Sequence, residues 1–159
     1  MFRKAALAAI AATMIAVTAA PAFAGPAETA FLQKLSNTWS GKGRLQGAES
    51  GAIACRIVFT AGGKSTKYQG RCNIPDMAQQ AFNGAISYND KAGRFEARSV
   101  GGTVPGVRKG DKLVFRSSSR NLGGTATSTM TISPSSLVVD FAMTDKQGAR
   151  TTSRITFSR

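Results

Sequence analysis

Glycine recurs at short intervals from residue 25 to the end of the chain, and this spacing constrains the fold more than any other feature. The 159 residues include 17 Gly, none of them among the first 24. Between the glycines lie short segments rich in Ile, Val, Phe, Thr and Tyr, which is typical of strands joined by tight turns. The pattern predicts an antiparallel meander with strands at 37–47, 52–60, 65–72, 82–89, 94–100, 103–108, 112–119, 125–133, 136–144 and 150–158.

The register of one hairpin follows from residue numbering, because residues opposed across an antiparallel pair have a constant sum of numbers. Cys55 with Cys72, and Phe59 with Tyr68, share one such sum, which centres the turn on Gly63–Lys64. Glycine in the first position suits a two-residue hairpin turn. We therefore expect a disulfide between the two cysteines, worth about 3 kcal/mol through loop closure. Two free buried thiols, or half of a metal site, are the alternatives.

A flat sheet of this many strands would leave exposed edges, and closure into a barrel removes them. We therefore predict an all-β fold, an antiparallel up-and-down β-barrel of about 8–10 strands with a short N-terminal helix. Residues 25–36 form the predicted helix, with Ala27, Phe31, Leu32 and Leu35 on one stripe. Residues 37–159 form the single barrel domain.

Residues 1–24 have the pattern of a secretory signal peptide. Arg3 and Lys4 precede a run of Ala, Leu, Ile and Val, and Ala22-Phe23-Ala24 fits the small-x-small cleavage site, so we expect cleavage after Ala24. The apolar run is shorter than a membrane span requires. The chain is thus expected to be a periplasmic or secreted monomer without a transmembrane segment, and an oxidising compartment agrees with the predicted disulfide.

Charge and the absence of histidine narrow the classes of function. The chain has no His, which removes the usual general base, His-dependent triads and most catalytic zinc sites. We expect no enzyme activity, no metal and no cofactor. The 21 Lys and Arg outnumber the 8 Asp and Glu, and no recognised nucleic-acid module accompanies them, so nucleic acid is not an expected partner.

Basic residues concentrate between positions 94 and 120. They could attract an anionic ligand or an anionic membrane surface, or they could simply solvate the barrel exterior. The predicted basic patch consists of Arg94, Arg98, Arg108, Lys109, Lys112, Arg116 and Arg120.

Aromatic residues fall about once on each predicted strand, where they could line a ligand cavity or pack as a plain core. Trp39 and Tyr68 carry a polar group that needs a partner when buried. The loop after Cys72 is the least strand-like part of the barrel, and such loops often bind ligands. The candidate ligand-binding residues are Trp39, Phe59, Tyr68, Ile74, Met77 and Phe115.

The order of elements resembles the calycin superfamily. A short helix precedes Leu35-Ser36-Asn37-Thr38-Trp39, and the meander ends in Arg154-Ile155-Thr156-Phe157. Lipocalins have Gly-x-Trp on the first strand and a basic residue on the last that stacks on the Trp. Here Asn37 stands in the Gly position, and Arg154 lies on the face opposite Ile155 and Phe157.

Two narrower families are also similar. Haem-binding barrels of the nitrobindin type resemble the segment Trp39-x-Gly41-x-Gly43, but their iron-binding histidine has no counterpart here, so the resemblance implies no haem. Periplasmic metalloprotease inhibitors are similar in combining a signal peptide, a Trp-bearing first strand and one disulfide. That resemblance implies an inhibitory role for residues 25–28.

These observations predict an exported, non-enzymatic β-barrel that binds a small apolar or anionic ligand at its open end. One alternative is a protease inhibitor or another barrel that binds an envelope protein. The other is a basic structural protein associated with the cell envelope.

Overall fold

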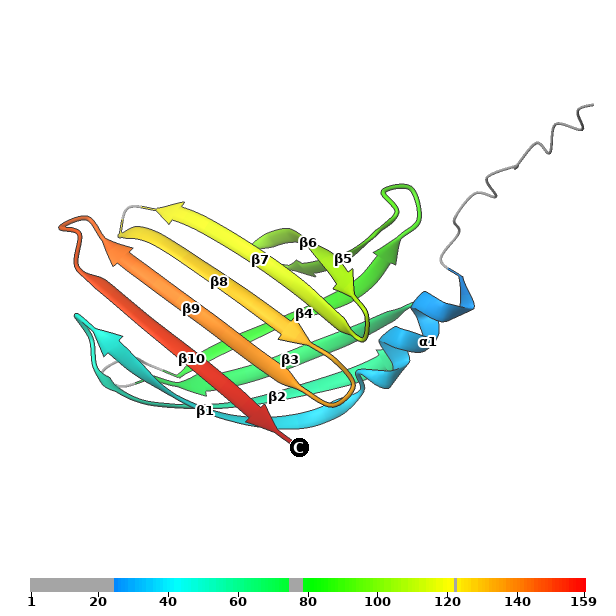
Figure 1. Cartoon of the computed structure of the whole chain (residues 1–159), viewed down its shortest axis with the longest axis horizontal. Coiled ribbons are helices and arrows are strands. Elements are labelled where there is room, and N and C mark those ends of the chain that lie inside the picture. Colours follow the sequence, from blue (N-terminus) through cyan, green and yellow to red (C-terminus); the bar gives the residue numbers. More distant parts are fainter. Residues whose placement is uncertain (1–24, 75–78, 122) are drawn as a thin grey trace, which may run out of the picture.

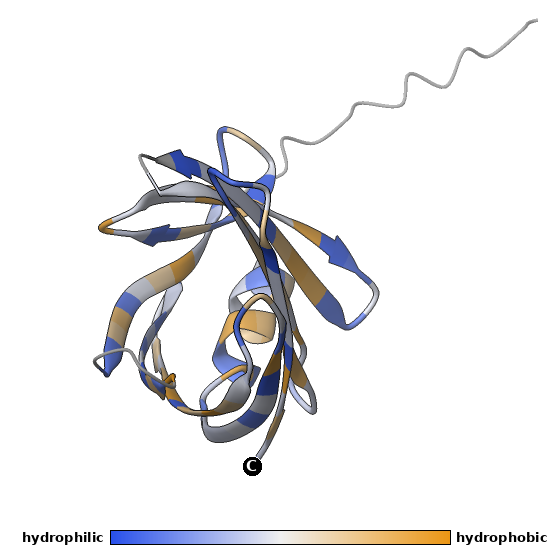
Figure 2. Cartoon of the chain, turned by 90° about the vertical axis from the view of Figure 1, so that its left-hand side faces the viewer, coloured by the Kyte–Doolittle hydropathy of each residue, from blue (hydrophilic) through white to orange (hydrophobic). Residues whose placement is uncertain are grey.

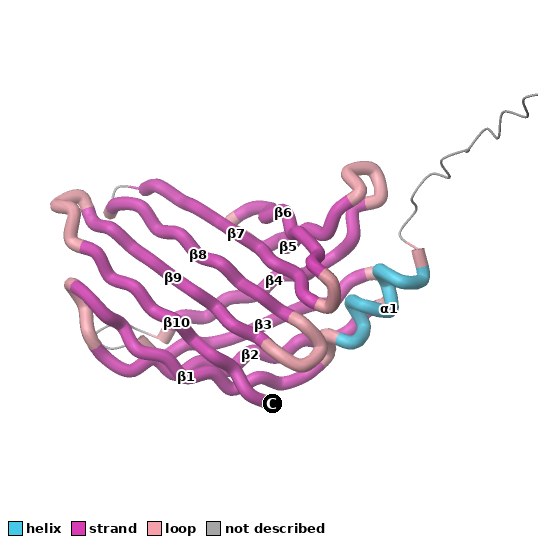
Figure 3. The backbone as a smooth tube through the Cα atoms, viewed as in Figure 1, coloured by secondary structure: helices cyan, strands magenta, loops and turns pink. Residues whose placement is uncertain are grey.

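The computed structural model describes residues 25–74, 79–121 and 123–159, which form one helix and ten strands (Figures 1 and 3). Every predicted strand is present, with its ends within two residues of the prediction. The elements are α1 (Pro26–Lys34), β1 (Asn37–Gly47), β2 (Gly51–Gly62), β3 (Ser65–Asn73), β4 (Gln80–Asn89), β5 (Arg94–Ser99), β6 (Gly102–Lys109), β7 (Lys112–Asn121), β8 (Gly124–Ile132), β9 (Leu137–Asp145) and β10 (Arg150–Ser158).

The strands form a closed antiparallel up-and-down barrel, as predicted. Each strand pairs with the next along the chain, and β10 returns to pair with β1. The predicted register of the second hairpin is confirmed, since Cys55 lies opposite Cys72 and Phe59 opposite Tyr68. Gly63 adopts the positive φ of 65° that this turn needs. The two cysteines form the predicted disulfide.

Helix α1 plugs one end of the barrel. Phe31 and Leu32 are buried on the helix and Leu35 directly after it, whereas Ala27 of the predicted stripe is exposed, because the first turn extends beyond the strands (Figure 1). The Thr66 hydroxyl on β3 donates a hydrogen bond of 2.5 Å to the Leu32 carbonyl. We call this end the helix half. Its fully buried side chains include Trp39, Ile86, Leu113, Ile132 and Leu137.

Two predictions for the N-terminus, the signal peptide at 1–24 and cleavage after Ala24, lie outside the described residues. Across the three described ranges, no helix has the length and apolar character needed to cross a membrane.

Candidate functional site

A cavity of about 300 Å³ lies inside the barrel, between the helix half and the opposite end. We call the part of the barrel that contains it the open half. Figure 2 views the barrel from that end, with α1 visible through the ring of strands. Every strand except β1 contributes to the lining, because inward-facing residues alternate along each strand. The apolar lining includes Ile57, Phe59, Phe82, Phe115, Met130 and Val139.

The cavity exists because several aromatic rings lie flat against the wall. Each of these rings belongs to a residue whose direct cross-strand partner is an inward-facing glycine, and an added Cβ on that glycine would collide with the ring. Glycine lets a neighbouring strand's side chain lie against its backbone, so the rings leave the centre of the barrel empty. The pairs are Gly41 with Phe157, Gly70 with Phe82, Gly84 with Tyr68, and Gly106 with Phe115.

Serine hydroxyls supply the polar groups of the open half. Ser99, Ser117 and Ser128 line the cavity, and the Oγ atoms of Ser117 and Ser128 lie 2.8 Å apart in a hydrogen bond. Nearby on β10, the Ser153 Oγ is buried without a hydrogen-bond partner among the described residues. Burial raises the pKa of the Tyr68 phenol, which therefore stays a neutral donor and acceptor.

The wall beside these serines is incomplete. The pairing of β4 with β5 begins only at Ala85 and Arg98. The pairing of β6 with β7 ends at Gly106 and Phe115, next to Pro105. Proline lacks the backbone N–H that would continue a ladder. Residues 116–120, in the C-terminal half of β7, are consequently exposed on both faces of the strand. This gap in the strand ladder lies beside the cavity, whose lining includes the exposed Ser99 and Ser117.

The structure brings three of the six candidate ligand residues into the lining, namely Phe59, Tyr68 and Phe115. Trp39 is 1% exposed and lies in the helix half, outside the lining. Ile74 packs against the core from outside the cavity, and Met77 lies outside the described residues.

Trp39 does have an arginine against its ring, but not the one that the lipocalin resemblance implied. The Arg159 guanidinium lies 5.1 Å from the centre of the indole, whereas Arg154 faces outward and pairs with Asp140. Arg159 comes two residues after the inward-facing Phe157, and the β1–β10 register, which pairs Ser40 with Ser158, places it opposite Trp39.

Sequence reasoning counted Phe82 among the strand aromatics that could line a cavity but did not select it as a candidate ligand residue, and it missed Met130 and the serines. A signal for Phe82 was present, because Gly70 with Phe82 and Tyr68 with Gly84 share one sum of residue numbers. The position of the cavity could not be predicted without the pairing of every strand.

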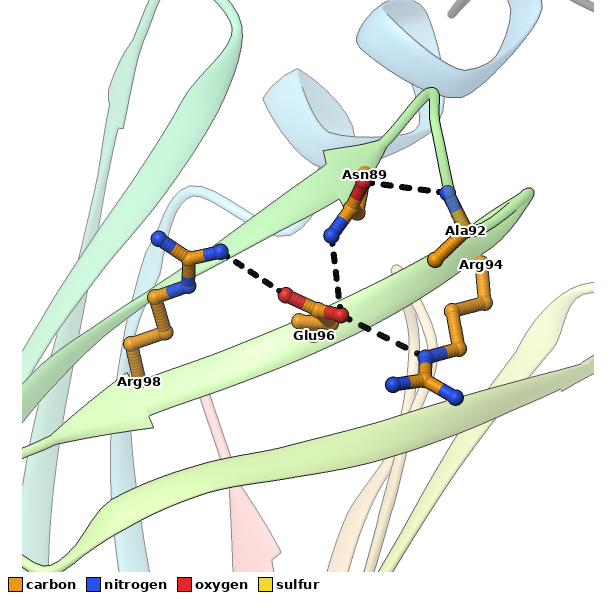
Figure 4. Close-up of polar contacts among 5 residues, drawn as sticks. All are labelled: Asn89, Ala92, Arg94, Glu96 and Arg98. Carbon is orange, nitrogen blue, oxygen red and sulfur yellow. Dashed lines mark hydrogen bonds and ion pairs between the residues drawn. The ribbon is translucent and has the colours of Figure 1, made fainter.

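Two arginines of the predicted basic patch are engaged by a buried carboxylate. Glu96, on the outer face of β5, is held by Arg98 at 2.9 Å, Asn89 at 3.0 Å and Arg94 at 3.3 Å (Figure 4). The hydrogen bond from Arg98, with those from Asn89 and Arg94, lowers the pKa of the Glu96 carboxyl despite its burial. Arg94 and Arg98 therefore contribute less free positive charge than their number suggests.

The structure separates the other members of the patch. The Arg108 guanidinium lies 4.5 Å from the centre of the Phe31 ring, against the helix. Lys109 and Lys112 face each other across the β6–β7 turn. Arg116 and Arg120 lie on the exposed part of β7, where charged side chains discourage a sheet edge from pairing with another chain.

The lining of the cavity is electrically neutral. Apart from Tyr68, its lining contains no ionisable side chain among the described residues. Within the same residues, no group of three His, Cys, Asp or Glu side chains could hold a metal ion. The arrangement can surround an apolar group and hydrogen-bond to one polar atom at the serines.

Comparisons with known proteins support the fold. No protein family and no curated protein matches the chain. Among solved structures, the chain is similar to the crystal structure of Rv2717c from M. tuberculosis, with a TM-score of 0.53 and 13% sequence identity. The similarity covers 85% of this chain and 99% of that chain. At this identity the match shows a shared barrel fold.

Proposed function

We propose that this protein is an exported, non-enzymatic, calycin-like barrel that holds a small, largely apolar ligand in its open half. The observation that carries the proposal is the cavity of about 300 Å³, with aromatic walls and a serine hydroxyl pair. Ligand sites are typically concave and mostly apolar, with a few placed polar groups that fix orientation. The volume is at the lower end of the usual range of about 300–1,000 Å³.

The lining indicates a neutral ligand with one hydrogen-bonding group. A charged ligand would lose its hydration without gaining a counter-ion, because Tyr68 is the only ionisable group in the described lining. The Ser117–Ser128 pair can both donate and accept, so a hydroxyl or carbonyl group suits it. A medium-chain alcohol has this chemistry.

Export and the absence of catalysis are parts of the same proposal. The Cys55–Cys72 disulfide supports export, since disulfides persist in oxidising compartments. A non-enzymatic role is supported by the cavity serines, which have no acid or base beside them in the described lining other than Tyr68.

Native mass spectrometry of the protein tests the proposal, first as purified gently from the cell envelope and then with added octanol. The expected result is a small bound mass that is lost on unfolding, or a one-to-one octanol complex. Ala97→Phe places a ring inside the cavity and should abolish both signals, at an overpacking cost of about 1–3 kcal/mol.

The matched control is Val107→Phe, which adds a ring to a 52% exposed outward position on the neighbouring strand. It should retain the bound mass. A protein that binds neither a native ligand nor octanol, or an Ala97→Phe variant that binds as well as Val107→Phe, would contradict the proposal. Circular dichroism confirms that both variants fold.

A further inference from the structure

A concavity of about 720 Å³ lies on the outside of the barrel, across the wall from the interior cavity. It extends over β1, β10, β9 and β8, and we call it the β1–β10 groove. Outward-facing residues on its floor, such as Thr129, Asp140 and Thr152, are only half-exposed.

The charge of the groove is strongly positive. Its lining contains four cations, Lys42, Arg44, Arg150 and Arg154, and one carboxylate, Asp140. Asp140 pairs with Arg154 at 2.8 Å. Among the described residues, the other three cations form no ion pair. The groove therefore has an excess of positive charge that the protein does not neutralise.

The register also places two of these cations directly against each other. Arg44 on β1 is the cross-strand partner of Arg154 on β10, and Ala52 is its partner on the other side. Like charges directly opposite each other on one face of a sheet are destabilising. Asp140 offsets only one of the two guanidiniums. An anion between them would turn the repulsion into two attractive contacts.

We infer that the β1–β10 groove binds a soluble ligand that carries at least two phosphate-like oxyanions. Arginine binds such groups through paired hydrogen bonds. Arg44 and Arg154 form one cationic position, and Arg150, four residues before Arg154 on the same face of β10, forms a second. Thr127 and Thr152 supply hydroxyl donors between the strands.

The concave shape favours a free ligand over a membrane. A bilayer surface is close to planar, so it would meet the rim of the groove rather than its floor. A small polyphosphorylated molecule can enter and contact the arginines and threonines together. The groove and the interior cavity lie on opposite faces of the wall and share Ser128 in their linings, but the groove cations lie outside the cavity lining, so the two sites can be tested separately.

Isothermal titration with pyrophosphate at low salt tests the inference. We expect saturable one-to-one binding that weakens as salt is added. Arg44→Gln and Arg154→Gln should each reduce the affinity by roughly tenfold, which is the loss of one charge-assisted contact. Without ligand, Arg44→Gln should raise the melting temperature slightly, because it removes the Arg44–Arg154 repulsion.

Arg71→Gln is the matched control, since Arg71 lies directly opposite Arg56 in a second arginine pair outside the groove. Its effect on pyrophosphate affinity should be below about twofold, the effect of one distant surface charge. Equal losses in Arg44→Gln and Arg71→Gln would show a general charge effect and overturn the site. Binding to phosphatidylglycerol vesicles but not to pyrophosphate would overturn the assignment of a soluble ligand.

Discussion

The two halves of this barrel are built from the same ten strands but filled in opposite ways. In the helix half, α1 and inward-facing aliphatic residues exclude solvent, and Leu32, Leu113 and Leu137 are 0% exposed. In the open half, aromatic rings lie against glycines, and serines line the interior where the helix half has leucines. The hydrogen-bond ladder between β6 and β7 also ends before β7 does. One half is packed like a protein core, and the other keeps a cavity beside a gap in the strand ladder.

This difference assigns stability to the helix half and leaves the open half for the proposed ligand. A well-packed plug fixes the shape of the strands, so the other end can hold empty volume without collapsing. Empty volume is costly, because the surrounding atoms lose their packing contacts. The disulfide between β2 and β3 lies in the wall of the cavity and strengthens the half that lacks a plug.

The largest effect should come from the helix half. Leu32→Ala leaves a void between α1 and the strands and should lower the free energy of unfolding by about 2–5 kcal/mol. Ser117→Ala, in the open half, should change it by no more than about 0.5 kcal/mol. Urea denaturation measures both. Equal losses in the two variants would contradict the division of the barrel into a stabilising and a binding half.

Removal of the disulfide should have the next largest effect. Replacing Cys55 and Cys72 by alanine should cost about 3 kcal/mol, mainly by releasing a constraint on the unfolded chain. Reduction of the wild type with dithiothreitol should give a similar loss in chemical denaturation, and the double variant should not respond to the reductant. A double variant as stable as the wild type would show that the cavity wall does not depend on the bond.

Gly106→Ala tests the origin of the cavity. Its added Cβ would lie 2.5 Å from Phe115 Cε1, so the ring must move inward. We expect a stability loss of about 1–3 kcal/mol and weaker octanol binding. The control is Gly101→Ala, whose Cβ would meet nothing closer than 3.6 Å. Unchanged octanol affinity in Gly106→Ala would show that the rings do not set the cavity volume.

The smallest effect concerns acid stability. The pKa of Glu96 is lowered in the folded protein, so its contribution to stability is present above the ordinary Glu value of 4.5 and is lost as the pH falls through the folded value. Glu96→Gln should therefore flatten the decline of stability below about pH 4.5. Thermal melts between pH 3 and 7 measure this decline. The same decline in the wild type and in Glu96→Gln would contradict the role of the Arg98–Glu96 contact.

The sequence predicted the strands well because alternation and turn glycines are local signals. The Cys55–Cys72 pairing was also predictable, since a two-residue turn fixes the register of its hairpin. Contacts between β1 and β10, where the barrel closes, were not predictable from the sequence. The Arg44–Arg154 opposition depends on β10 returning to β1, and neither residue belongs to the charge-rich stretch between 94 and 120.

The location of the cavity could not be predicted for a related reason. An aromatic residue on a strand fills the interior or lies against the wall according to its cross-strand partner. Trp39 faces Ile57 on β2 and fills the helix half, whereas Phe115 faces Gly106 and leaves space. The apolar character of both side chains predicts that both lie in the core, and only the strand register distinguishes their roles.

Methyl NMR during an octanol titration can distinguish the two halves of the barrel, because it reports on both of them at once. The predicted result is saturable shifts at Ile57, Met130 and Val139, which line the cavity. Methyl groups of Leu32, Ile132 and Leu137, which are fully buried in the helix half, should stay in place. Equal shifts in both halves, or no shifts at saturating octanol, would contradict the account.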